Sequence, residues 1–437
     1  MNIIQLIEHL NLFMAVLFTV LYFYQLVYLG VGLVRRKRPP RLPETCKFHR
    51  YAAVISARNE EGVIGELIQC LKQQNYPSEL LDIYVVADNC TDDTAGAARA
   101  AGAIVYERQD QRLKGKGYAL DWLFHHLAAE ERDVYDAYLI FDADNLVDKE
   151  FVREMNRVFD TGKYDALTCY RNSKNFGDNW ISAGYSIWFL REARFLSYPR
   201  MLLGSNCHVS GTGFLVSSRV IRENGGWPYH LLTEDIEFSV SSAVKGFRIG
   251  YCDAAVVYDE QPTTFRQSWD QRLRWSKGFY QVDRKYAIPL LKGCARLDKT
   301  SWSCYDMLMT VAPGMLLTLA VFLFNGIICA ACLVEPPYIA RYVISLCLEF
   351  MGSSLLTFYA GLLVYGIVTV LSEWKNISAP AAKKVLYVFL FPVFMFTYIP
   401  ISLAALVRRV EWKPIYHSST KQPSTARYLF GAGTCRP

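Results

Sequence analysis

Four long and almost uncharged apolar runs set the strongest limit on what this chain can fold into. They lie near residues 11–34, 307–334, 342–371 and 385–407. Each is close to or above the roughly 20 residues that a helix needs to cross a bilayer. Between the first two runs lies a mixed, charged stretch with the length of a soluble domain. The pattern predicts a hybrid protein with membrane helices at both ends, in agreement with 52% hydrophobic and 20% charged residues.

The first apolar run is interpreted as a membrane anchor within residues 1–38. It is too long for a cleaved signal peptide and is followed by Arg35-Arg36-Lys37-Arg38. Basic residues collect on the cytoplasmic side of a span, so we expect the following domain to be cytoplasmic and the protein to be a multi-pass protein of the cell membrane. The twelve cysteines show no zinc-type spacing and are expected to be reduced, which fits that compartment. The net charge of +6 is attributed to the membrane surface, and no nucleic-acid partner is predicted.

Strands and helices are predicted to alternate from residue 50 onward, which is typical of an α/β fold with a parallel sheet. The expected strands are 51–56, 82–87, 103–106 and 136–141, and the expected helices are 62–74, 91–101 and 117–128. Ligands of such sheets bind beyond the carboxyl ends of the strands. The first, second and fourth strands end in Ser56 to Glu61, in Asp88 and in Asp142-Ala143-Asp144, so a nucleotide with a metal is expected at this edge. Motifs for dinucleotide binding and for ATP hydrolysis do not occur in the sequence, which argues against both chemistries.

Asp142 and Asp144 form the only Asp-x-Asp sequence in the chain. Two carboxylates at a ligand-binding edge can hold Mg²⁺ or Mn²⁺ against a diphosphate. Taken alone, the same sequence is also compatible with a solvated acidic turn.

The sequence Thr233-Glu234-Asp235 opens a stretch of helical character. Asp235 is a candidate general base that accepts the proton of an acceptor hydroxyl. The alternative is simple capping, because Thr at the cap position and acids in the first turn stabilise a helix N-terminus.

An amphipathic stretch over residues 263–302 contains Gln271-Arg272-Leu273-Arg274-Trp275 and is expected to form helices on the membrane surface. Two arginines can bind one diphosphate and a Trp can stack on a sugar ring. A basic face that meets lipid headgroups is the alternative. Lys116 is a candidate to bind an anionic ligand at the start of a helix, and a surface turn is the alternative interpretation. Ser210 and Gly211 allow an acceptor to approach the backbone or mark a strand bend.

In this order, Asp88, Asp142-x-Asp144, Thr233-Glu234-Asp235 and Gln271-x-x-Arg274-Trp275 resemble the motifs of the membrane-integrated family 2 glycosyltransferases, the group of cellulose, chitin, hyaluronan and mixed-linkage β-glucan synthases. The resemblance covers about residues 50–285. It implies a GT-A fold over residues 45–262, a UDP-sugar donor, inversion to a β-linked product, and a C-terminal membrane region over 303–410 that forms a channel for the growing glycan.

The resemblance also implies roles for the individual residues. Asp88 would contact the uracil, Lys116 and the Asp142/Asp144 pair would serve the diphosphate and metal, and Asp235, with Glu234 beside it, would be catalytic. Arg274 and Arg272 would bind the diphosphate. Trp275 would form the floor of an acceptor site that includes Ser210 and Gly211. The remaining predicted donor-binding residues are Ser56, Asn59, Glu60 and Gln271. The family often has paired aspartates after the second strand, whereas here Ala87 precedes Asp88.

The tail over residues 411–437 contains Trp412-Lys413-Pro414-Ile415-Tyr416-His417, which resembles a gating loop that closes over the donor in some members. Trp412, Lys413 and His417 can reach a cytoplasmic site only if the tail is cytoplasmic. Arg408-Arg409 and the prolines Pro392 and Pro400 therefore predict that one hydrophobic segment does not cross the membrane simply.

The leading functional hypothesis is a processive polysaccharide synthase that uses UDP-glucose to make a β-glucan. UDP-N-acetylglucosamine is an alternative donor. The runner-up is a glycosyltransferase that adds one or a few sugars to a lipid. A transport or scaffold protein that has lost catalysis is disfavoured, because every expected acidic position is occupied.

Overall fold

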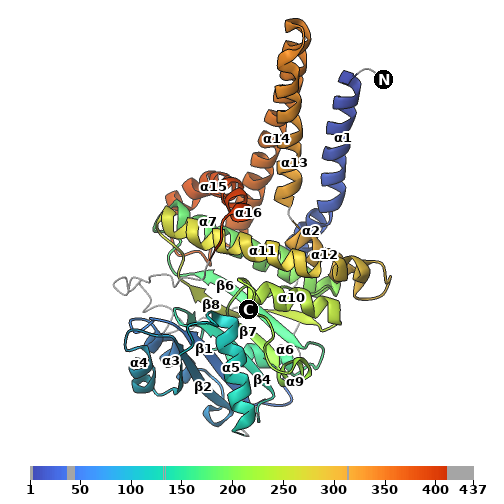
Figure 1. Ribbon diagram of the computed structural model, residues 1–437. Coiled ribbons are helices and arrows are strands. Elements are labelled where there is room, and N and C mark those ends of the chain that lie inside the picture. The colour runs from blue at the N-terminus through green and yellow to red at the C-terminus, as the bar shows by residue number, and fades with distance from the viewer. Residues whose placement is uncertain (1–2, 37–44, 131, 133, 313, 411–437) are drawn as a thin grey trace.

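The chain folds into an α/β domain, a layer of helices above it, and a set of long helices that project away from that layer (Figure 1). The computed structural model describes residues 3–36, 45–130, 132, 134–312 and 314–410. Those residues include both sides of the boundary between the sheet domain and the apolar helices, which is where the acidic motifs and the Gln-x-x-Arg-Trp sequence meet.

One sheet of eight strands forms the centre of the α/β domain, with the order β3-β2-β1-β4-β7-β6-β8-β5. The strands are β1 (Tyr51–Ala57), β2 (Leu81–Asp88), β3 (Ile104–Arg108), β4 (Ala137–Asp142), β5 (Leu146–Val147), β6 (Ala166–Ser173), β7 (Phe214–Ser217) and β8 (Ile249–Asp259). The first four are the strands predicted from the sequence. They pair in parallel, with Tyr51 opposite both Leu81 and Ala137.

The prediction of a parallel sheet is incomplete for the second half, because the whole sheet is mixed. Strand β7 runs antiparallel to both β4 and β6, and β5 runs antiparallel to β8, while β6 and β8 are parallel. β7 has four residues and β5 has two, so neither is long enough to produce a readable alternation of apolar and polar residues.

Apolar side chains cover both faces of the sheet. Residues such as Val54, Val86 and Ile140 point to one face, and their neighbours Ile55, Val85 and Phe141 point to the other, as the two-residue period of a strand requires. The helices of the domain are α3 (Ile64–Lys72), α4 (Thr94–Ala101), α5 (Lys116–Ala129), α6 (Phe151–Phe159), α9 (Ser218–Asn224) and α10 (Glu234–Lys245). Strands buried on both faces hold the loops at their carboxyl ends in fixed positions.

The helical layer crosses the sheet domain on the side of the strand ends (Figure 1). It consists of α7 (Trp180–Glu192), a π-helical turn over Ala193–Ser197, α8 (Tyr198–Leu203), α11 (Phe265–Cys294) and α12 (Ser301–Val311). The amphipathic stretch predicted over 263–302 is thus mainly one helix of 30 residues. The second apolar run, predicted as one span over 307–334, is divided: α12 packs against α10 and α11 through a separate apolar cluster, and α13 (Gly314–Ala331) projects outward.

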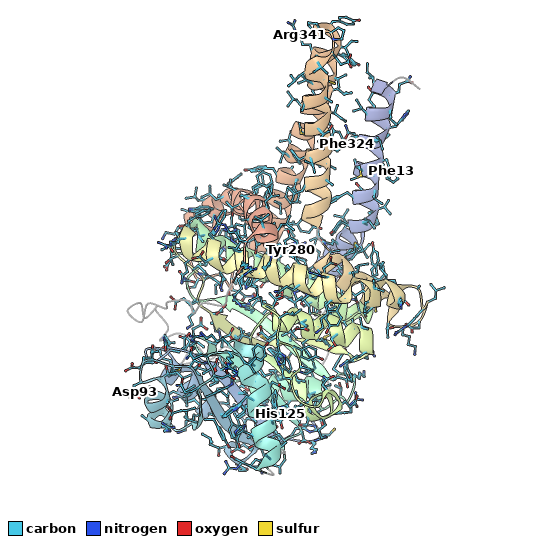
Figure 2. All side chains as sticks on the ribbon, viewed as in Figure 1. Phe13, Asp93, His125, Tyr280, Phe324 and Arg341 are labelled. Atoms are coloured by element: carbon cyan, nitrogen blue, oxygen red, sulfur yellow. The ribbon has the colours of Figure 1, made fainter. Side chains whose placement is uncertain are left out.

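Three described helices are long and apolar enough to cross a membrane: Ile4–Arg35, Pro337–Ser372 and Ala381–Val407. The first divides at Phe23 into α1 (Ile3–Tyr22) and α2 (Tyr24–Arg36), and the second is α14 (Pro337–Ser372). Helices α1, α13 and α14 project together, with an amide pair between Asn11 and Asn325 joining α1 to α13 (Figure 1). Many of their apolar side chains are exposed, including Leu323 and Phe13, as expected for contact with lipid. Phe13 lies on the projecting part of α1 (Figure 2).

The third apolar helix is bent and lies differently from the other two. It divides at Thr397 into α15 (Ala381–Phe396) and α16 (Tyr398–Val407). Both parts lie against the helical layer, at the base of the projecting helices (Figure 1). Tyr280 of α11 donates a hydrogen bond to the carbonyl of Ser402, and Lys277 donates to the carbonyl of Ala405. This arrangement supports the prediction that one hydrophobic segment does not cross simply.

A buried ion pair joins two helices of the helical layer, α8 and α12, and also contacts α2. Arg200 of α8 donates to both carboxylate oxygens of Asp306 of α12, at 2.8 and 2.7 Å, and Tyr28 of α2 donates to the same carboxylate at 2.8 Å. Arg200 is 1% exposed and Asp306 is not exposed, so each charge depends on the other for solvation.

We expect Asp306→Leu to destabilise the protein by about 3–5 kcal/mol, because it leaves Arg200 buried and unpaired. The double variant Arg200→Met/Asp306→Leu should recover most of that loss. Thermal unfolding in detergent measures both effects. Glu107→Gln, which breaks an exposed pair with Arg99, is the matched control and should cost no more than about 1 kcal/mol. A double variant as unstable as the single variant would contradict this account.

Candidate active site

A single cavity of about 1840 Å³ connects the carboxyl ends of the strands with the helical layer and the projecting helices. Its lower wall contains Ser56, Glu60, Asp88, Lys116 and the Asp142/Asp144 pair. Its upper wall contains side chains of α7, α11 and α16. The predicted donor edge and the predicted acceptor helix therefore face the same space.

Asp142 ends β4, and its carboxylate faces a lysine and a glycine loop. Lys116 donates from Nζ to Asp142 Oδ1 at 2.5 Å and to the carbonyl oxygen of Gly211 at 2.6 Å. Lys116 is the first residue of α5, so the N-terminus of that helix also faces the site. The lysine side chain is 12% exposed. A cation, a helix N-terminus and a carboxylate thus lie together where a diphosphate and its metal are expected.

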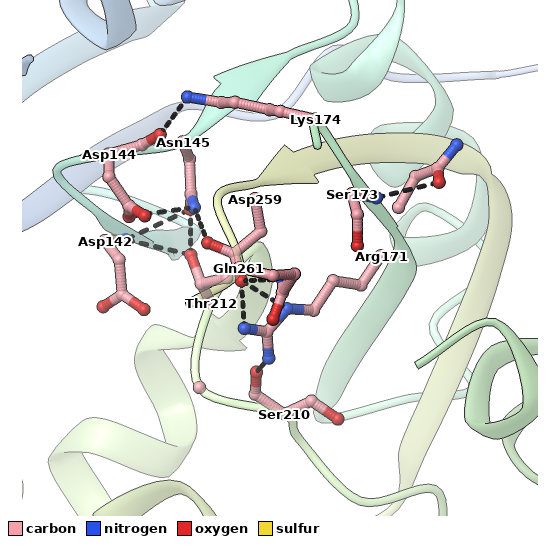
Figure 3. Close-up of polar contacts among 12 residues, drawn as sticks. Asp142, Asp144, Asn145, Arg171, Ser173, Lys174, Ser210, Thr212, Asp259 and Gln261 are labelled. Atoms are coloured by element: carbon pink, nitrogen blue, oxygen red, sulfur yellow. Dashed lines mark hydrogen bonds and ion pairs between the residues drawn. The ribbon is translucent and has the colours of Figure 1, made fainter. Parts of the chain in front are cut away.

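Asp144 lies deeper than Asp142, beside a second acidic group that sequence reasoning missed. Asp259 ends β8, accepts hydrogen bonds from Arg171, Asn145 and Gln261, and lies next to the Asp142–Asp144 loop (Figure 3). Burial and the neighbouring Asp259 raise the pKa of Asp144 well above its ordinary value. Polar residues at the ends of the sixth and eighth strands are the signal that could have identified Arg171 and Asp259, by the same rule that identified Asp142.

The Asp142/Asp144 pair fits a divalent cation bound together with a diphosphate. In the part of the chain that the structure describes, no group of three or more His, Cys, Asp or Glu side chains could hold a metal without further ligands. Mg²⁺, however, is commonly held by one or two carboxylates with substrate phosphates and water completing the shell. The crowding of negative charge around Asp144 is a second observation in favour, since a cation would compensate it. Asp142 and Asp144 are therefore the residues that would hold Mg²⁺ or Mn²⁺.

Glu234 and Asp235 form the first turn of α10 at the other side of the cavity. The side chain of Thr233 makes no capping hydrogen bond, so the capping interpretation does not hold for Thr233 itself. Gly278 of α11 faces Thr233 so closely that a side-chain carbon there would meet it at 2.5 Å. Because residue 278 is a glycine, α11 packs closely against the start of α10, which lines the cavity.

Asp235 and Asp142 face one point above Gly211. A side-chain carbon on Gly211 would lie 3.7 Å from Asp235 Oδ2 and 3.9 Å from Asp142 Oδ2. Gly211 has φ of +81°, a conformation that favours glycine. The loop therefore approaches both carboxylates without a side chain between them, which leaves room for a reacting group beside a metal site and a base.

Burial and the charge of Asp235 raise the pKa of Glu234 to about 7, although Lys116 and Arg274 oppose the shift. Burial also raises the pKa of Asp235. Glu234 thus takes up a proton near neutral pH, which changes the charge beside Asp235. A carboxylate that acts as a base is active above its own pKa and is lost as pH falls through it.

We therefore expect kcat to fall as pH is lowered and the Asp235 carboxylate takes up a proton. Glu234→Gln should move this acidic limb to lower pH, because Asp235 then has no neighbouring carboxylate to share a proton with. A pH profile of the two proteins at saturating donor measures the shift. If both proteins lost activity at the same pH on the acidic side, the Glu234–Asp235 pair would not set the pH dependence of kcat.

The Gln-x-x-Arg-Trp sequence lies on α11 above the carboxylates. Gln271, Arg274 and Trp275 line the cavity. Arg274 donates to the carbonyl of Leu232 next to the Thr-Glu-Asp sequence, at 3.3 Å, and Trp275 packs edge-to-face against Tyr185 and Phe189 of α7. Arg274 and Trp275 thus face the same cavity as the acidic residues, and their contact with donor and acceptor stays a prediction.

The prediction that Arg272 also binds the diphosphate is corrected, because this side chain lies on the other face of α11. It is 0% exposed and does not line the cavity. Its guanidinium donates to the carbonyl of Phe394 and the hydroxyl of Thr397, and lies 4.3 Å from the centre of the Phe394 ring. Positions 272 and 274 are two residues apart, which places them about 200° apart around a helix. Arg272 joins α11 to α15 and α16.

The other predicted donor residues divide between the cavity and its surroundings. Ser56, Glu60 and Asp88 line the cavity. Burial, followed by the charge of Asp142, raises the pKa of Glu60 to about 8. Asp88 is 3% exposed and accepts from Arg108 at 2.5 Å. Asn59 lies outside the cavity and exchanges two hydrogen bonds with Thr91, so it joins the loops after β1 and β2.

Ser210 and Gly211 lie on a loop between two buried polar groups. The carbonyl of Ser210 accepts from Arg171, and its hydroxyl donates to Glu192. Glu192 is also 3.0 Å from His208 Nε2. His208 lines the cavity together with Glu192. The predicted gating residues Trp412, Lys413 and His417 lie outside the described residues.

The fold and these groups together define a GT-A-like α/β domain joined to membrane helices. Residues 49–278 match the family described as "Glycosyltransferase like family 2", and the chain belongs to that family. A solved structure of the mannosyltransferase PcManGT from Pyrobaculum calidifontis, in complex with GDP-Man and Mn²⁺, has the same fold. It is 15% identical, with a TM-score of 0.52 over 92% of this chain and 99% of that one.

Relatives of known name fall into two kinds. The chain is 27% identical over 251 residues to a beta-monoglucosyldiacylglycerol synthase from Synechocystis sp., covering 56% of this chain and 51% of the relative. It is 23% identical over 239 residues to a poly-beta-1,6-N-acetyl-D-glucosamine synthase from Staphylococcus aureus, covering 52% and 54%. The chain thus spans about half the length of these relatives.

Proposed function

We propose that this chain transfers a sugar from a nucleotide-sugar donor, with inversion, to a hydroxyl group of a membrane lipid. The observation that carries the proposal is the shape of the cavity. It begins at the acidic strand ends and continues, without a wall between, to apolar side chains of α1, α13 and α14. An acceptor with a polar head at Asp235 and an apolar tail among these helices would fit it.

The character of the projecting helices favours a lipid over a growing polymer. In this region the cavity is lined by side chains such as Phe18, Phe322, Phe350 and Phe358. A polysaccharide needs polar partners along its path, whereas these residues offer a lipid chain an apolar surface. The described part of the membrane region projects as α1 and the α13–α14 pair, and α15 and α16 lie at their base (Figure 1).

The reaction is a direct displacement. The acceptor hydroxyl oxygen attacks the anomeric carbon and forms the new C–O bond, while the bond from that carbon to the diphosphate breaks and the nucleoside diphosphate leaves with the electron pair. Asp235 accepts the hydroxyl proton. Lys116 and Arg274 supply positive charge toward the leaving diphosphate. A divalent cation held by Asp142 and Asp144 would neutralise further charge on that group when bound.

The processive polysaccharide synthase remains the second candidate, because Trp275 is placed to stack on a sugar of an acceptor chain. UDP-glucose is our proposed donor, on the resemblance to the glucan synthases and on the glucolipid synthases among the relatives. We also propose that the α/β domain faces the cytoplasm, since Arg35 and Arg36 end α2 on the side of that domain.

Product analysis distinguishes the two candidates. Purified protein in lipid nanodiscs is incubated with Mg²⁺ or Mn²⁺ and a panel of labelled UDP-sugars, and the product is divided between organic and aqueous phases and then sized. We expect a short, organic-soluble product at every donor concentration. A long, glucanase-sensitive product from UDP-glucose would favour the polysaccharide synthase and would contradict the proposal.

A further inference from the structure

Four arginines of the described residues are buried, and two of them have no acidic partner there. Arg108 pairs with Asp88 and Arg200 pairs with Asp306. Arg191 and Arg272 have no carboxylate within 4.0 Å among the described residues. Arg272 is surrounded by carbonyl and hydroxyl oxygens and does not reach the cavity, as described above. Arg191, in contrast, lines the cavity.

The surroundings of Arg191 hold its side chain but do not neutralise it. Its Nη2 donates to Oε1 of Gln25 on α2 at 2.8 Å, and the guanidinium lies 4.8 Å from the ring centre of Tyr365 on α14 and 5.4 Å from that of Trp188. The neighbouring Glu192 is engaged by His208 and Ser210. Burial lowers the pKa of Arg191, and the charge of the neighbouring Glu192 opposes this shift only in part. An arginine remains charged even so, so a full positive charge faces the cavity.

The position of Arg191 lies between the reacting groups and the apolar end of the cavity. Glu192, the next residue of α7, holds the Ser210–Gly211 loop that faces Asp235. Gln25 belongs to α2, which directly follows α1, and Tyr365 belongs to α14. Both α1 and α14 continue into the apolar part of the cavity. A group bound to Arg191 would therefore sit between a hydroxyl at Asp235 and a chain among the projecting helices.

We propose that Arg191 binds the phosphate of the acceptor, and that the acceptor is a lipid with a phosphodiester between its apolar tail and a hydroxyl-bearing headgroup. This inference rests on the lipid acceptor proposed above and names its class. A guanidinium matches phosphate oxygens in a planar, bidentate geometry, and the phosphate would supply the negative charge that Arg191 lacks. The presence of a base at Asp235 favours a headgroup hydroxyl as the nucleophile, because a phosphate oxygen carries no proton that needs removal at neutral pH.

The test compares two lipids that differ in the phosphate. Wild-type protein, Arg191→Gln and Arg191→Lys are placed in a phosphate-free sugar-based detergent that contains either phosphatidylglycerol or the diacylglycerol with the same acyl chains. Retention of each lipid after purification is measured by native mass spectrometry, and transfer from the donor is measured in parallel. We expect wild-type protein to prefer phosphatidylglycerol, and Arg191→Gln to lower that preference at least tenfold. Arg191→Lys should fall between them.

Stability separates binding from a structural role. Because Arg191 has no ion pair in the described structure, Arg191→Gln should unfold at the wild-type temperature or above it, unlike a variant of Arg200. Equal retention of the two lipids by wild-type protein, or an unchanged preference in Arg191→Gln, would overturn the inference. If sugar is transferred efficiently to diacylglycerol and Arg191→Gln does not change the lipid preference, the acceptor is still a lipid. The proposal that Arg191 binds its phosphate would then be wrong. A polymeric product with the expected retention pattern would retain the lipid site and reject the proposed function.

Discussion

Replacing Asp235 with asparagine is expected to abolish sugar transfer while leaving donor binding largely intact. General-base catalysis typically contributes about 10²–10⁴-fold, and an amide of the same shape cannot accept the proton of the acceptor hydroxyl. Asp235 faces the point above Gly211 that Asp142 also faces, so the carboxylate is placed at the reacting centre. The donor contacts expected of Lys116 and Arg274 do not involve it. Turnover with the preferred UDP-sugar and binding of UDP by calorimetry measure the two effects separately.

Two variants make this result specific. Glu234→Gln changes the neighbouring carboxylate and should shift the pH profile with a smaller loss of turnover. Glu223→Gln changes an exposed carboxylate on α9, outside the cavity, and should leave transfer unchanged. Unchanged turnover in Asp235→Asn would remove this residue from the role of base. Loss of UDP binding together with turnover would instead assign it to the donor site.

The sequence identified the donor edge because one physical rule connects strand order to ligand position. The first four strands were readable from their alternation with helices, and their carboxyl ends carry Ser56, Asp88 and Asp142, all of which line the cavity. The rule does not depend on distant contacts. It works wherever a strand is long enough to be recognised and its end is polar.

The same reasoning failed where the position of a side chain depends on packing between distant elements. Arg272 and Arg274 belong to one motif, but only the tertiary position of α11 between the cavity and α15 determines which of them faces the donor. Arg171 and Asp259 lie near the ends of β6 and β8, which join the first four strands only through the short antiparallel β7. Their polar strand ends could be assigned to the same edge only once that pairing is known. Arg191 lies in the almost wholly buried helix α7, where apolar periodicity is weak, and its lack of a partner is visible only when α2 and α14 are in place.

The apolar runs show a related limit. Hydropathy marks a segment as able to cross a membrane, but it does not separate a span from a helix that packs on the domain. The run over 307–334 contains one of each, since Met307 and Val311 of α12 are buried against α10 and α11, whereas α13 projects. Pro392 and Pro400 were the local hints in the sequence that the last run is bent, and the structure divides this run at Thr397.

Removing the metal site is expected to have the second large effect. Asp144→Asn should lower turnover by about 10²–10³-fold, the usual loss when one electrostatic contribution to the leaving group is removed. Chelation of divalent cations should lower wild-type turnover similarly, and added Mn²⁺ should restore it. In the variant, added Mn²⁺ should have little effect. Asp148→Asn, which changes a carboxylate outside the cavity, is the matched control and should respond to Mn²⁺ as the wild type does.

Thermal unfolding tests the same site without reference to turnover. Asp144 is 6% exposed beside Asp259 and Asp142, so without a cation its charge is a source of repulsion in the folded state. Asp144→Asn removes that repulsion and should unfold at the wild-type temperature or above it. A ligand that binds only the folded state raises its stability in proportion to the logarithm of ligand concentration over Kd. Mn²⁺ with UDP should therefore stabilise the wild type and not the variant, and equal stabilisation of both would place the metal elsewhere.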